Sequence, residues 1–297
     1  MQYTIQTIIF AALAAFPAAI YGQGLSGNGT AGMAFPDGVV PCSQFPSQYG
    51  AVPVGITSGG WSGLQRNGGN DDAIGECQEG ALCSYDCPAG YSKSQYPAAQ
   101  PASGESHGGL LCKGGFLYKT RPEVPQLCEA GSNTAFVENL LAGHVAVCRT
   151  DYPGTEKMSL PVGLSSGEIS PLTSPYQDTA YRTVKGGRTS AHYYLNKEGV
   201  SVADACQWGE EGQDLGNWAP IVLGASYVDG KTWLSITKNE LNPNANLGYN
   251  VRIVGKDGGR ISQDCRYENE AITGQGFGDG CTVAVQGKDQ ATFQFYN

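Results

Sequence analysis

Residues 220–237, PIVLGASYVDGKTWLSIT, decide the fold. Two runs rich in β-branched and aromatic residues, 220–228 and 231–237, flank the dipeptide Asp229-Gly230. An Asp-Gly pair between two such runs is the strongest short-range signal for a β-hairpin, because both turn positions need positive φ angles. The stretch therefore predicts two antiparallel strands joined by a tight turn.

Working outward, the rest of the second half repeats this pattern of strand, turn and strand. Several successive hairpins favour an all-β sandwich or barrel. We expect an antiparallel, disulfide-rich β-sandwich with one short helix near 133–142, where Phe136, Val137, Leu140 and Leu141 form a helical stripe. The further paired segments are 179–185 with 188–195, 248–256 with 260–267, and 281–286 with 290–296.

The composition excludes several classes of protein. Charged residues make up 15% of the 297 residues, 43 are glycine, and the net charge is −9. These values argue against coiled coils, helical bundles and charge-driven disorder. An acidic chain without clustered Lys and Arg is also a poor match for nucleic acid or an anionic membrane.

The amino terminus predicts secretion. Residues 8–20 form an apolar run that is too short to span a bilayer but typical of a signal peptide, which we place at 1–22. A flexible Gly/Ser/Asn-rich tail is expected at 23–40, with a glycosylation sequon at Asn28. Cysteines occur on both sides of the chain's midpoint, so we treat 41–297 as one domain. No later segment reads as a membrane anchor.

The cysteines agree with an oxidising compartment. Ten cysteines follow the signal segment, which predicts about five disulfides whose connectivity the sequence leaves open. Their spacings do not match zinc sites and the three histidines are scattered, so we expect no metal and no cofactor. The cysteines are Cys42, Cys77, Cys83, Cys87, Cys112, Cys128, Cys148, Cys206, Cys265 and Cys281.

Carboxylates beside aromatic residues are the remaining candidates for chemistry. The chain has no GxSxG elbow, Walker loop or HExxH motif, whereas glycoside hydrolysis needs only two carboxyl groups. Asp151 and Glu156 flank a Pro-Gly turn and are the first choice, although an Asp before a turn often only caps it. Asp178 and Asp204 follow as further catalytic candidates, with Tyr152, Tyr176, Trp208 and Trp218 as expected sugar contacts. Trp233 lies inside a strand and is expected in the core.

Several motifs resemble the fungal SUN family. The spacing Cys77-x5-Cys83-x3-Cys87-x24-Cys112 is similar to the family's signature, and matching blocks follow in the same order up to the end of the chain. The long Ser/Thr-rich stretch of many relatives is missing, so the chain resembles the shorter branch. The blocks are CSYDCPAGYSKSQYP (83–97), GGLLCKGGFLY (108–118), CRTDYPGTE (148–156), SAHYYLNKEGVSV (190–202) and GNWAP (216–220).

The resemblance implies a secreted, cell-wall-associated protein that binds and hydrolyses β-1,3-glucan, acting in wall remodelling, septation and cell separation. It does not assign catalytic residues. By analogy with secreted glucan-active proteins of similar character, we expect a sandwich similar to that of thaumatin-like proteins. The alternative is a non-catalytic glucan-binding or structural wall protein, and a transglycosylase is a third reading. The sequence leaves the oligomeric state open.

Overall fold

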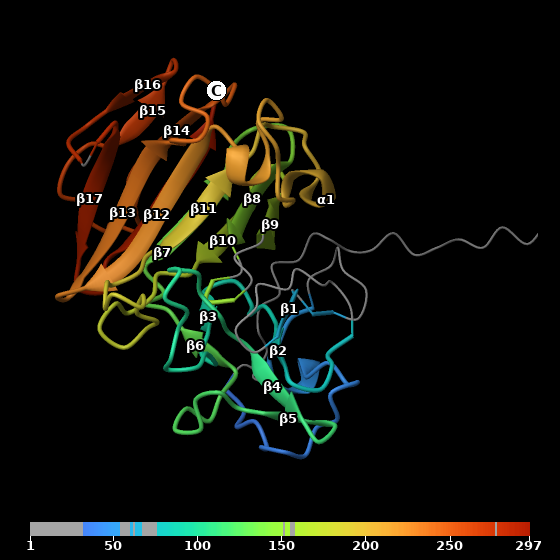
Figure 1. The fold of residues 1–297 in the computed structure, drawn as a ribbon. Coiled ribbons are helices and arrows are strands. Elements are labelled where there is room, and N and C mark those ends of the chain that lie inside the picture. Colours follow the sequence, from blue (N-terminus) through green and yellow to red (C-terminus); the bar gives the residue numbers. More distant parts are fainter. Residues whose placement is uncertain are drawn as a thin grey trace, which may run out of the picture.

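The computed structural model describes residues 32–53, 60–61, 63–66, 76–150, 152–154, 158–276 and 278–297. The predicted signal peptide and Asn28 lie outside these residues. The described chain forms two parts, which we call the amino-terminal lobe (32–130) and the sandwich (131–297) (Figure 1). From residue 32 on, the predicted tail is part of the lobe, because Phe35 and Val40 are buried in its core.

The amino-terminal lobe is small and rich in loops. It contains a 4-stranded sheet of order β1-β2-β4-β5 and a 2-stranded sheet of β3 and β6. Three disulfides, Cys42–Cys112, Cys77–Cys83 and Cys87–Cys128, are packed into its core with Tyr85 and Leu110. Its elements are η1 (Ser47–Tyr49), β1 (Gly63–Arg66), β2 (Ala81–Ser84), β3 (Tyr91–Lys93), β4 (Leu110–Lys113), β5 (Phe116–Tyr118) and β6 (Cys128–Ala130).

The sandwich consists of two 6-stranded sheets whose inner faces share one core. The first sheet has the order β10-β7-β18-β14-β15-β16, and the second has the order β17-β13-β12-β11-β8-β9. The strands are β7 (Ala135–Asn139), β8 (Val145–Thr150), β9 (Met158–Leu164), β10 (Ile169–Leu172), β11 (Ala191–Leu195), β12 (Ile221–Val228), β13 (Lys231–Lys238), β14 (Asn250–Lys256), β15 (Arg266–Glu268), β16 (Ala271–Thr273), β17 (Gly280–Gln286) and β18 (Gln290–Tyr296).

The hairpin predicted from 220–237 is present and central. Strands β12 and β13 pair antiparallel from Ile221↔Lys238 to Val228↔Lys231. Asp229 and Gly230 both have positive φ, 53° and 73°, as a tight two-residue turn requires. Leu234 and Ile236 of β13 are buried in the core, whereas their neighbours along the strand are not. Side chains therefore alternate between the core and the outer face of the sheet, as expected for a strand of a sandwich. The expected all-β, disulfide-rich sandwich is confirmed.

The helix predicted at 133–142 is wrong. This segment forms β7, in which Ala135, Val137 and Asn139 are buried and the residues between them are half-buried. The same residues therefore fit both a strand pattern of period two and a helical stripe. The strand forms because β7 pairs with β10 on one side and with β18 on the other. The one α-helix among the described residues is α1 (Val202–Ala205), and η2 (Gly216–Trp218) is a short 3₁₀ turn.

Two further pairings differ from the prediction. Residues 179–185 form no strand and contact 188–195 through the bridge Arg182↔Arg188 and a hydrogen bond from Thr189 Oγ1 to the Tyr181 carbonyl oxygen, because β11 pairs with β8 and β12 instead. Strands β17 and β18 follow one another along the chain but belong to different sheets. The sheets are antiparallel except that β18 and β7 run parallel, since they come from distant parts of the chain.

The disulfides do not link the lobe to the sandwich. Cys148–Cys206 and Cys265–Cys281 lie in the sandwich, and no cysteine is free. The lobe and the sandwich each have a hydrophobic cluster of their own. No helix in the described ranges has the length and apolar character needed to cross a bilayer.

Candidate functional site

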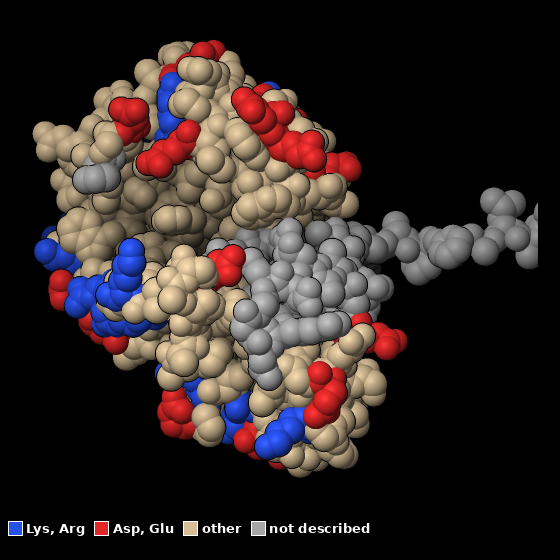
Figure 2. Space-filling view, in the orientation of Figure 1, with Lys and Arg blue, Asp and Glu red and all other residues tan. Residues whose placement is uncertain are grey.

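A pocket of about 400 Å³ lies where the lobe meets the sandwich. Strands β3 and β6 of the lobe form one wall, and β8, β11 and the segment between β10 and β11 form the other. A cavity of this size fits a small ligand, and junctions between structural units are common places for binding sites. Figure 2 shows this side of the molecule, with a hollow of mostly uncharged atoms over the second sheet and Lys and Arg atoms gathered below it.

Glu129 is the carboxyl group that faces this pocket among the described residues. It lies on β6 opposite Ser92 of β3, and its neighbour Cys128 is tied to Cys87 by a disulfide. Burial raises the pKa of Glu129, while the Arg121 guanidinium, 4.0 Å from its Oε1, opposes that shift. Glu129 is therefore a rigidly held carboxyl group with an increased tendency to keep its proton.

Three tyrosines connect Arg121 to the pocket. The guanidinium of Arg121 stacks on Tyr96 at 4.5 Å and donates a hydrogen bond of 2.6 Å to its hydroxyl oxygen. Tyr181 contacts the rings of both Tyr96 and Tyr152 edge to face, at 5.1 and 5.0 Å. Tyr152 and Tyr181 line the pocket, so it offers aromatic surface of the kind on which sugar rings pack.

The Tyr152-Pro153-Gly154 turn is held against the lobe. The Gly154 N–H donates to Ser106 Oγ at 3.4 Å, and a Cβ on Gly108 would lie 2.3 Å from the Pro153 carbonyl oxygen. Only glycine allows this close approach. Gly108 and Pro153, which are far apart in sequence, are therefore in close contact beside the pocket-lining Tyr152.

Arg149 and His192 line the opposite wall. Arg149 is at the end of β8, next to Tyr193 of β11, and is only 5% exposed. His192 is open to solvent but surrounded by the walls of the pocket, and this desolvation lowers the pKa of its imidazole. At neutral pH His192 is therefore uncharged, and it can donate or accept a hydrogen bond.

The residues singled out in the sequence fall into three groups. Asp151 and Glu156 lie outside the described residues, so their role stays a prediction. Tyr152 lines the pocket, and Asp178 lies at its rim through an ion pair of 2.8 Å with Arg188. Tyr176 is 43% exposed and packs its ring on Tyr227, 4.9 Å away.

Asp204, Trp208 and Trp218 do not line this pocket. Asp204 is on α1, where its backbone N–H and carboxylate both bond to the capping hydroxyl of Ser201. Trp208 is 53% exposed beyond that helix, and Trp218 is on η2. Sequence reasoning did not select Glu129, Arg149 and Tyr181, which also line the pocket. A signal was present for two of them, because Glu129 directly follows Cys128 and Arg149 directly follows Cys148, and a disulfide fixes the backbone beside it.

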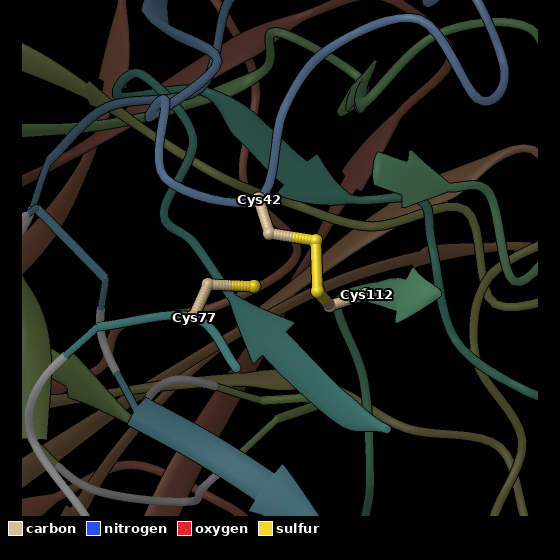
Figure 3. Close-up of side chains that lie close together, drawn as sticks. All are labelled: Cys42, Cys77 and Cys112. Atoms are coloured by element: carbon tan, nitrogen blue, oxygen red, sulfur yellow. A yellow bond between two sulfur atoms is a disulfide. The ribbon is translucent and has the colours of Figure 1, made fainter. Parts of the chain in front are cut away.

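Three sulfur atoms lie close together in the lobe, as the ligands of a metal ion do. The Sγ atoms of Cys42, Cys77 and Cys112 lie within 4.8 Å of one another in the lobe. Figure 3 shows the disulfide between Cys42 and Cys112, with the Cys77 sulfur beside it. Cys77 forms its own disulfide with Cys83. Zinc binds thiolates, so these oxidised sulfurs form two adjacent disulfides and offer no thiolate ligand.

Comparison with known proteins gives a consistent result. A family model described as "Beta-glucosidase (SUN family)" matches residues 37–283. A probable secreted beta-glucosidase of Schizosaccharomyces pombe is 48% identical over 265 residues, which is 88% of this chain and 82% of that protein. The secreted beta-glucosidase SUN41 of Candida albicans is 46% identical over 264 residues, 89% of this chain and 62% of that protein.

Among solved structures, the thaumatin-like xylanase inhibitor TLXI is similar over 55% of this chain and 98% of its own length, with 12% identity. The TM-score of this match is 0.34. The likeness to thaumatin-like proteins therefore stays a prediction.

Proposed function

Because this chain belongs to the SUN family, we propose that it is a secreted glycoside hydrolase that cleaves β-linked glucan. The relatives named above are called secreted beta-glucosidases, which supports this reaction class and an extracellular location. More specifically, we propose β-1,3-glucan of the fungal cell wall as substrate, and wall remodelling during septation and cell separation as the role. No cofactor is needed for this reaction.

The observation that supports a hydrolase most directly is Glu129 in the pocket. A general acid must hold a proton at the working pH and deliver it to the leaving oxygen. Burial raises the pKa of Glu129, which is the shift that this role needs. We propose Glu129 as the general acid, with sugar rings packed on Tyr152 and Tyr181.

The second carboxyl group would come from the block 148–156. Asp151 immediately precedes Tyr152, and Glu156 follows the turn that is packed on Gly108. Either could serve as base or nucleophile on the other side of the sugar. Asp178, at the rim, is the further candidate, whereas Asp204 has its carboxylate engaged at the start of α1.

The test is product formation by the purified, oxidised protein on linear β-1,3-glucan oligosaccharides, followed by mass-resolved chromatography. We expect Glu129→Gln to lower kcat about 10²–10⁴-fold, the usual contribution of a general acid. Glu123→Gln is the matched control, because Glu123 also pairs with Arg121, at 3.1 Å, but its side chain is 66% exposed and does not line the pocket. The double variant Asp151→Asn/Glu156→Gln tests the second carboxyl group in the same assay.

The outcomes separate the readings. Shorter products from the native protein and the Glu123→Gln control, but not from Glu129→Gln, support the site. Equal cleavage by all of them would keep the hydrolase and reject Glu129. Longer products would indicate a transglycosylase. Retained binding to insoluble glucan with no cleavage by the native protein would reject the hydrolase in favour of a binding module.

A further inference from the structure

Arg149 brings a largely buried positive charge to the pocket, and none of the described residues pairs with it. Arg149 is only 5% exposed, and it lines the cavity. Within the described part of the chain its side chain makes no ion pair or hydrogen bond, although Glu129 faces the same space. Burial of a guanidinium costs free energy that a bound anion would offset, so an arginine that lines a pocket in this way is a candidate for binding a ligand.

The fold places Arg149 there for a local reason. Val145 and Val147 of β8 point into the core, and Arg149 continues the same face at the end of the strand, where the sheet reaches the lobe. The pairing of β8 with β9 shifts register between Val147 and Arg149. The extra residue lies in β9, between Val162 and Ser159, so β8 keeps its alternation up to Arg149, and bulges are frequent beside active sites.

The charge around Arg149 is positive as well. Among the described lining residues, Lys93, Arg149 and Arg188 are cationic, and Glu129 is the one carboxylic acid. Arg182 and Lys185 are exposed on the segment that leads to Arg188. In a chain with a net charge of −9, this local excess of positive charge is a specific feature. Such a patch attracts anions and increases their rate of association.

We propose that the pocket binds an oxyanion, the carboxylate or phosphate of an acidic saccharide, with Arg149 as its main binding residue. The guanidinium offers a planar fork of donors that matches the two oxygens of a carboxylate or phosphate. Arg188 contributes from the rim, where Asp178 already orients it through their ion pair. The acidic saccharide would be a further ligand beside the neutral glucan, and its saccharide part rests on the proposed function, whereas oxyanion binding does not require that any glycosidic bond be cleaved.

Isothermal titration calorimetry tests this directly, with glucuronate, glucose 6-phosphate and inorganic phosphate as anionic probes and glucose as the neutral one. We expect the three anions to bind at least 10-fold more tightly than glucose, and affinity to fall as salt is added. Arg149→Gln should weaken anion binding at least 10-fold, and Arg149→Lys should recover part of it. The ratio between glucuronate and glucose 6-phosphate identifies the preferred oxyanion.

Two further variants keep the test decisive. Arg188→Gln at the exposed rim should weaken anion binding several-fold if Arg149→Gln fails to fold. Arg252→Gln is the control, because Arg252 stacks on Tyr296 at 4.5 Å in the first sheet, away from the pocket. Equal affinity for glucose and glucose 6-phosphate, or unchanged anion binding in folded Arg149→Gln, would overturn the proposal. Glu129→Gln should bind anions at least as tightly as the native protein, so anion binding without turnover would reject the hydrolase alone.

Discussion

At the scale of single residues, Arg121 lies beside two glutamates whose pKa values shift in opposite directions. The exposed Glu123 has a lowered pKa, first through a hydrogen bond from its own backbone N–H and then through Arg121. Glu129 has a raised pKa, because burial outweighs the attraction of the same guanidinium. Burial therefore decides which of the two can act as an acid.

Arg121→Gln should move the pH profile of the enzyme. Removing the guanidinium takes away the influence that lowers the pKa of Glu129, so that pKa rises further. A general acid works in its protonated form, and the alkaline limb of kcat/KM should therefore shift to higher pH. The measurement is a pH profile of kcat/KM for the native protein, Arg121→Gln and Glu123→Gln.

The position of the limb is the informative quantity, since Arg121 also supports Tyr96 and its loss can lower the overall rate. An alkaline limb that stays in place, or moves to lower pH, would mean that Glu129 does not supply the proton. The Glu123→Gln profile should keep the native limb.

Sequence reasoning located part of the site at this scale. It selected Tyr152, because an aromatic residue beside acids and a Pro-Gly turn suggests a sugar contact, and Tyr152 does line the pocket. It missed Glu129, since nothing near Glu129 in the sequence shows that β3, β8 and β11 will surround it. It also placed Trp233 in the core, which is wrong, because Trp233 is 37% exposed. Its side chain points to the face of β13 opposite to that of Leu234 and Ile236.

At the scale of elements, the contact between the 152–154 turn and the segment around Gly108 links the lobe to the sandwich. Gly108→Ala would place a methyl carbon 2.3 Å from the Pro153 carbonyl oxygen. Backbone cannot yield as a flexible side chain does, so the turn must shift. We expect a loss of about 1–3 kcal/mol in the free energy of unfolding, as for other overpacked sites.

The same substitution should reduce activity more than stability alone explains, because Tyr152 moves with the turn. A displacement of about 1 Å can cost on the order of 10²-fold in rate. Urea denaturation and kcat/KM give the two values. Gly32→Ala is the control, since a Cβ there meets no atom within 4 Å. Native activity in Gly108→Ala would show that the turn does not position the site.

Local signals predicted elements well where turn chemistry was explicit. Asp229-Gly230 specified the β12–β13 hairpin, with both residues at positive φ. Gly287 and its neighbours also form a turn, yet the turn carries the chain from β17 in one sheet to β18 in the other. A short sequence can show that the chain reverses, but the choice of partner depends on distant strands such as β7.

At the scale of the whole molecule, disulfides stabilise each part separately. Cys148–Cys206 closes a separation of 58 residues in the sandwich, and Cys77–Cys83 closes only 6 in the lobe. In the loop-closure model, longer loops lose more entropy when they are cross-linked in the unfolded chain. Removal of the first should therefore cost about 4 kcal/mol and removal of the second about 2 kcal/mol.

The comparison uses Cys148→Ala/Cys206→Ala and Cys77→Ala/Cys83→Ala, with unfolding free energies from urea denaturation. All four cysteines are buried, so the two double variants create similar cavities and their difference isolates the loop length. Equal losses in both would argue that strain or packing, and not chain entropy, determines how these bonds stabilise the protein.

The division of the cross-links between the two parts has a consequence for motion. Since every disulfide closes within the lobe or within the sandwich, the two bodies are joined covalently by main chain alone. A saccharide bound at the proposed site would touch both walls and act as a removable tie between them. Its binding free energy then adds to their docking, so the occupied molecule is a stiffer and more cooperative body than the empty one.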